Sequence, residues 1–130
     1  MDLETRKTAL VLARCRAVMG MVLVFLPGLV AWLWCGESSP RTRALLRMVG
    51  VRDLVLGVGA LTSVKERTQD AEWVGMGAIA DAVDGVVTLT VPGIPLRGRL
   101  VGPAAIGSSL LGIKIARELA DAREAAPLVN

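Results

Sequence analysis

Histidine and tyrosine are absent from this 130-residue sequence, and phenylalanine occurs only once. Without histidine there is no His-based general acid or base, no Ser-His-Asp triad and no histidine ligand of the kind that most zinc and haem sites use. With so few aromatic side chains to stack on bases, the net charge of +3 is assigned to a membrane surface and not to nucleic acid. Any chemistry must use carboxylates, arginine, lysine or hydroxyl groups.

Cysteine is also scarce. Cys15 and Cys35 lie twenty residues apart on what is expected to be one helix, and about 30 Å of helix between them is too far for a disulfide. No zinc or redox site is expected, and the sequence indicates no cofactor.

Apolar residues, in contrast, make up 53% of the chain, which is too hydrophobic for an ordinary soluble domain of this size. Four apolar segments of near-membrane length predict an all-α fold, a four-transmembrane-helix bundle that forms a single membrane domain over 1–130. A kink is expected at Pro27, because proline cannot donate the helical hydrogen bond. The predicted spans are approximately 17–35, 45–64, 73–91 and 100–119.

The lysine and arginine distribution predicts the orientation of these spans. One side of the membrane would hold nine basic residues and the other five, and the richer side is expected to be cytoplasmic. The prediction is a multi-pass protein of the cytoplasmic membrane (the cell inner membrane) with both termini cytoplasmic. The nine are Arg6, Lys7, Arg14, Arg16, Lys65, Arg67, Lys114, Arg117 and Arg123; the five are Arg41, Arg43, Arg47, Arg97 and Arg99.

Small residues are frequent in the second, third and fourth spans, and glycine alone occurs 14 times. In lipid, helices associate through close backbone approach at such residues, so a tight bundle is expected. The expected partner is the lipid bilayer. Four short helices can be too few to enclose a pathway, so a homo-oligomer such as a homodimer is a further hypothesis, and the sequence names no small ligand.

Charged residues nevertheless occur in the middle of two predicted spans. Arg52 and Asp53 lie 12 and 11 residues before Val64, and Asp84 lies 11 residues after Trp73. If these spans form a hairpin, all three lie about 16–18 Å from its turn and share one depth. An unpaired charge there costs roughly 2.5–3.5 kcal/mol on insertion scales. Arg52 is therefore expected to meet Asp84, with Asp81 one turn away on the same helical face.

Three carboxylates around the single guanidinium of Arg52 cannot all remain ionised in a medium of low dielectric constant. At least one is expected to hold a proton near neutrality or to be neutralised by a bound cation. Lys114 is a candidate counter-charge for Asp81; the alternative is that its long side chain reaches the cytoplasmic surface.

Three hypotheses account for this polar cluster. It organises the bundle as a buried clasp, or it also binds a proton or cation as in small transporters, or it belongs to an enzyme in which Asp81 and Asp84 hold a divalent metal against a phosphate-bearing lipid. We favour a non-enzymatic protein that combines the first two roles and keep the metal enzyme as the alternative. The cluster residues are Arg52, Asp53, Asp81 and Asp84.

The segments "RMVGVRDLVLGVGAL" and "GAIADAVDGVVTL" place an Arg-Asp pair in the second span and a D-x-x-D pair in the third. In these motifs the chain resembles a family of small four-span actinobacterial membrane proteins of unknown function. The resemblance covers most of residues 45–112. It implies the four-span fold and the intramembrane polar cluster, and it implies no activity.

Overall fold

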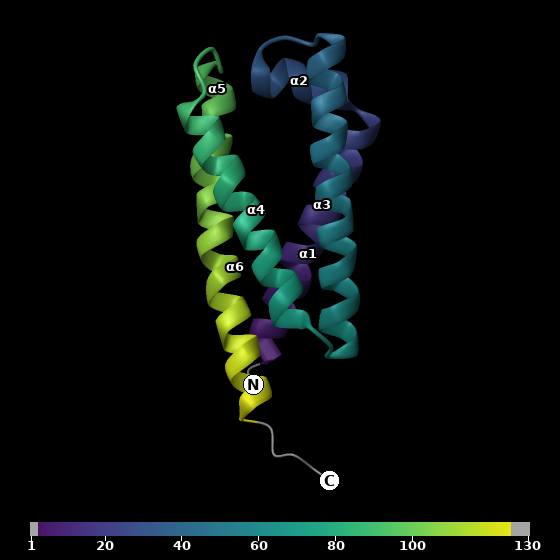
Figure 1. The fold of residues 1–130 in the computed structure, drawn as a ribbon, viewed down its shortest axis with the longest axis vertical. Helices are drawn as coiled ribbons and strands as arrows, with labels where there is room; N and C mark the ends of the chain where they lie inside the picture. The colour runs from purple at the N-terminus through teal and green to yellow at the C-terminus, as the bar shows by residue number, and fades with distance from the viewer. Residues whose placement is uncertain (1–2, 126–130) are drawn as a thin grey trace.

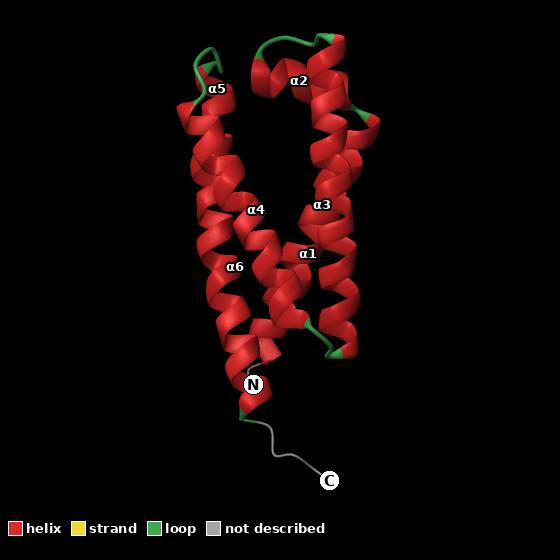
Figure 2. Ribbon diagram, viewed as in Figure 1, coloured by secondary structure: helices red, strands yellow, loops and turns green. Residues whose placement is uncertain are grey.

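The computed structural model describes residues 3–125, and its regular elements are all helices (Figure 2). Loops and turns between them are short. In chain order the helices are α1 (Leu3–Phe25), α2 (Pro27–Cys35), α3 (Pro40–Glu66), α4 (Asp70–Thr90), α5 (Leu96–Arg99) and α6 (Val101–Glu124).

The four long helices form two closely packed pairs, α1 with α3 and α4 with α6 (Figure 1). The pairs converge at the end that holds the start of α1, the end of α6 and the turn at 67–69; we call this the terminal end. They separate toward the opposite end, where α2 and α5 lie, which we call the loop end. The fold thus places both ends of the described chain on one side.

The first helix differs from its predicted span. A span over 17–35 is wrong, because α1 is a 23-residue helix that ends at Phe25. Leu26 has φ −121° and ψ 43°, outside the helical region, and Pro27 begins α2. Proline lacks the N–H that would continue the hydrogen-bond ladder and is well suited to the first turn of a new helix. The expected kink is therefore a complete break.

Three helical segments are long and apolar enough to cross a membrane: Leu3–Phe25, Asp70–Thr90 and Leu96–Glu124. The predicted span at 45–64 lies within α3, which is 27 residues long. It does not belong to this group, because any 18-residue stretch of α3 that contains Arg52 and Asp53 also includes Arg47 or Lys65. α3 is therefore long enough to cross a membrane, but every 18-residue stretch of it contains at least three charged residues.

Large apolar side chains cover the outside of the long helices. Val55 is 55% exposed on α3, Ile79 64% on α4 and Leu110 65% on α6. So large an exposed apolar surface is unusual for a soluble monomer and is typical of a surface that faces lipid or a partner.

Glycine brings α1 and α3 into backbone contact. A Cβ on Gly57 would lie 2.5 Å from the Ala17 nitrogen and 2.8 Å from the Ala17 Cα, and a Cβ on Gly20 would lie 2.7 Å from the Gly50 carbonyl oxygen. Side chains cannot occupy such distances, so only glycine permits this approach. The pair α4–α6 uses Gly112 against Ala78 in the same way.

Replacing Gly57 by alanine is therefore expected to separate α1 from α3 and to lower the free energy of unfolding by about 1–3 kcal/mol, the usual cost of overpacking. Gly107→Ala is the matched control, because a Cβ at Gly107 meets nothing within 4 Å. Thermal unfolding in an uncharged detergent compares the two. Equal melting temperatures would contradict the close packing of α1 on α3.

Ion pairs and an apolar core close the terminal end. The carboxylate of Asp70, only 4% exposed at the start of α4, accepts hydrogen bonds from Arg6 at 3.1 Å and Arg123 at 2.8 Å. The apolar core beside it draws on four helices and consists of Ala9, Ala13, Ala60, Val64, Val74, Ile115 and Leu119. The ion pairs and the apolar core hold the four long helices together at the terminal end.

Candidate functional site

Arg52, near the middle of α3, and Asp84, in the second half of α4, lie against each other, as their equal predicted distances from the turn indicate. Nη1 of Arg52 donates to Oδ1 of Asp84 at 3.0 Å, and Nη2 donates to Oδ2 of the same carboxylate. Arg52 also donates from Nε and Nη2 to Oδ1 of Asp53, at 3.2 and 3.0 Å. This paired, fork-like geometry is the strongest form of an arginine–carboxylate contact.

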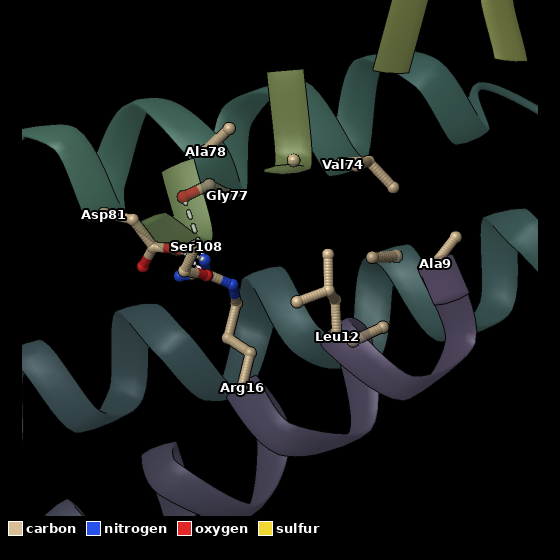
Figure 3. Close-up of a pocket in the computed structure, with 11 residues that line it drawn as sticks. Ala9, Leu12, Arg16, Val74, Gly77, Ala78, Asp81 and Ser108 are labelled. Carbon is tan, nitrogen blue, oxygen red and sulfur yellow. Dashed lines mark hydrogen bonds and ion pairs between the residues drawn. The ribbon is translucent and has the colours of Figure 1, made fainter. Parts of the chain in front are cut away.

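Arg16 of α1, which was counted among the nine basic residues on one side of the membrane, supplies a second guanidinium to the cluster. Its Nη2 donates to Oδ2 of Asp81 at 2.5 Å and to the Gly77 carbonyl oxygen at 2.9 Å, while Nη1 lies 3.5 Å from Oδ1 of Asp53. Figure 3 shows its side chain reaching from α1 toward Asp81. Since α1 begins at Leu3, Arg16 lies about 20 Å into the helix.

A sequence signal for Arg16 does exist. Ala9, Ala13, Ala17 and Gly20 recur at spacings of three and four, which is the period of one helix face, and all four are buried. Arg16 follows Ala13 by three residues and therefore lies beside this packed face. The exposed Arg14 lies on the opposite side.

The fourth long helix contributes a hydroxyl group. Oγ of Ser108 in α6 donates to Oδ2 of Asp81 at 2.6 Å. The Asp81 carboxylate thus joins α1, α4 and α6, and the Asp84 carboxylate joins α4 to α3 (Figure 3 shows Asp81, Arg16 and Ser108). The cluster links all four long helices, including the two pairs, at one level.

Lys114 lies outside this arrangement. Its ammonium is 3.8 Å from the Glu118 carboxylate on the same helix, and its side chain is 73% exposed. It follows Ser108 by six residues, about 9 Å farther along α6 toward the terminal end. The counter-charge that faces Asp81 is Arg16, so the candidate role of Lys114 is taken by a residue from another helix.

With Arg16 included, the cluster has one more positive charge than was expected from the sequence. The cluster holds two guanidinium groups and three carboxylates, so it carries one formal negative charge in excess when all are ionised. Its side chains are enclosed to different degrees, with exposed fractions of 10% for Asp53, 13% for Arg16, 16% for Asp81, 20% for Asp84 and 35% for Arg52. In such surroundings an uncompensated charge is costly, so a proton or a cation is needed for neutrality.

The metal hypothesis requires Asp81 and Asp84 to direct oxygens at one ion. Each carboxylate instead faces a different arginine, Asp81 toward Arg16 and Asp84 toward Arg52. Within residues 3–125, no three Cys, Asp or Glu side chains are grouped so that they could hold a metal ion.

Three hollows in the described part of the chain meet the cluster. Toward the terminal end, a pocket of about 20 Å³ beside Arg16 and Asp81 has room for little more than one water molecule (Figure 3). Toward the loop end, a cavity of about 480 Å³ lies between the two helix pairs, and Asp53, Asp81 and Asp84 line it. A third hollow of about 180 Å³ is lined by Cys15, Arg16, Asp53, Asp81 and Ser108 among others, so two of the three carboxylates are also reached from beside α1 and α6.

No protein-family model, curated protein or solved structure matches this chain.

Proposed function

We propose that this protein is an integral protein of the cytoplasmic membrane in which α1, α3, α4 and α6 cross the bilayer with both termini cytoplasmic. The length and apolar character of three of these segments support this topology. For α3, support comes from the contacts of Arg52 and Asp53, which direct their charges at the cluster and not at lipid. The resemblance to the four-span actinobacterial family is in accord with the same arrangement.

In this proposal the polar cluster holds the two helix pairs together and binds one proton or one small cation, as in a small transporter. The observation that carries it is the excess of one carboxylate in a cluster whose three carboxylates line the cavity between the helix pairs. A purely structural clasp would be expected to balance its charges, because a surplus buried charge destabilises the fold.

Thermal unfolding of the purified protein from about pH 5 to pH 9 tests this role. If a proton neutralises the surplus carboxylate, the melting temperature falls as pH rises, because loss of the proton leaves an unpaired negative charge among Arg16, Arg52, Asp53, Asp81 and Asp84. Added sodium or potassium should restore part of the loss. The dependence should vanish in Asp81→Asn or Asp84→Asn and persist in the control Asp121→Asn, an exposed position on α6.

A flat profile in the wild type, with both cluster variants merely less stable, would overturn proton or cation binding and leave only the clasp. Stabilisation by Mg²⁺ or Mn²⁺ but not by sodium or potassium, lost in Asp81→Asn, would overturn it in favour of the metal enzyme.

A further inference from the structure

We propose that the 480 Å³ cavity binds an amphipathic organic cation, a molecule with one ammonium or phosphonium centre and an apolar body. This inference rests on the proposed function, because the charge of the ligand would replace the proton or small cation at the cluster.

The walls are almost entirely apolar and come from both helix pairs. Met19 and Val22 of α1 and Val49 of α3 face Val101 and Ala105 of α6 across the cavity. Sites for small organic molecules commonly have volumes of about 300–1,000 Å³ and apolar walls with a few polar groups that fix orientation. The volume and lining suit the body of such a molecule better than a hydrated inorganic ion.

The floor is acidic. Asp53, Asp81 and Asp84 line the cavity, whereas Arg16 and Arg52, which pair with them, do not. The guanidinium groups approach the carboxylates from outside the cavity, so the carboxylates are the charges that a ligand would meet. Together with the net excess of one negative charge, this arrangement selects a single positive charge and disfavours an anion.

The one basic side chain in the lining is already engaged at the mouth. Arg97 of α5 donates to the carbonyl oxygens of Trp32 at 2.9 Å and Leu33 at 3.2 Å, near the C-terminal end of α2. Its guanidinium lies 4.7 Å from the centre of the Trp32 ring. These contacts hold its guanidinium against α2, and the ion pairs of the floor carboxylates are made with Arg16 and Arg52 instead of Arg97.

Two ions of the same shape and opposite charge, tetraphenylphosphonium and tetraphenylborate, test the inference by titration against the purified protein in an uncharged detergent. We expect tetraphenylphosphonium to bind and tetraphenylborate to bind at least tenfold more weakly. Lowering the pH should weaken the binding of tetraphenylphosphonium, because protons compete for the surplus charge among Arg16, Arg52, Asp53, Asp81 and Asp84. Asp84→Asn should weaken it at least tenfold.

Because a cluster variant can lose its fold, a second pair of variants leaves the charges intact. Ala105→Trp fills the cavity and should abolish the binding of tetraphenylphosphonium, whereas Ala104→Trp changes the neighbouring exposed residue, which does not line the cavity, and should retain it. Equal binding of both ions, or unchanged affinity in a folded Ala105→Trp protein, would overturn the inference.

The two proposals fail separately. The pH dependence of stability is measured without any organic ion, so its persistence in a wild type that does not bind tetraphenylphosphonium would overturn the amphipathic ligand alone. A flat pH profile would overturn the proposed binding of a proton or small cation.

Discussion

Replacing Arg16 by glutamine is expected to destabilise the protein by about 3–5 kcal/mol, the usual cost of removing one partner of a buried ion pair. Asp81 would lose its guanidinium partner, and Asp53 would lose the longer of its two arginine contacts, the one at 3.5 Å. The negative excess of the cluster would rise from one charge to two. A fall in the melting temperature on the order of 10 °C should follow.

Two further proteins make this test specific. Arg14→Gln removes the same charge from an exposed position two residues away on α1 and should change the melting temperature little. The double variant Arg16→Gln/Asp81→Asn removes both charges of the pair and should recover much of the lost stability. If Arg16→Gln is as stable as Arg14→Gln, the pairing of Arg16 with Asp81 is wrong.

Arg52→Ala is the second substitution with a large expected effect. Its loss would leave Asp84 without a guanidinium partner and break the contact between α3 and α4. The Arg52 side chain is 35% exposed, more than that of Arg16, so solvent screens its charge more strongly. We therefore expect Arg52→Ala to lower the free energy of unfolding by about 2–4 kcal/mol, less than the cost for a fully buried pair.

A double-mutant cycle isolates this pair. Arg52→Ala, Asp84→Ala and the combined variant should give a coupling free energy of about 1–3 kcal/mol. Arg41→Ala, an exposed arginine near the start of the same helix, is the control and should be nearly neutral. Additive effects of Arg52→Ala and Asp84→Ala would contradict a direct contact.

Much of the helical framework could be predicted from local patterns. Apolar runs separated by polar segments with proline and glycine predicted the helices that became α3, α4 and α6, with ends within three residues of those observed except at the start of α3 and the end of α6. The meeting of Arg52 with Asp84 followed from one length argument, because both lie equally far from a short turn.

Local patterns failed where a residue supported two interpretations. Pro27 permitted either a kink within one long span or the start of a new helix, and the sequence around it does not distinguish them. Arg16 follows other basic residues near the chain start, and this pattern indicated a place at the membrane surface. Its true position depends on α1 starting at Leu3 and on which face of α1 packs against α3.

The sequence by itself determined the composition of this protein: apolar helices, no histidine, and mid-helix charges that must face one another. Only the tertiary structure decided that Arg16 meets Asp81, that the carboxylates exceed the guanidinium groups by one, and that the carboxylates line a cavity between the helix pairs. The physical reason is that the backbone contacts of Gly57 with Ala17 and of Gly20 with Gly50 set the rotation of α1. These contacts join residues at least thirty positions apart, beyond the range of any local pattern.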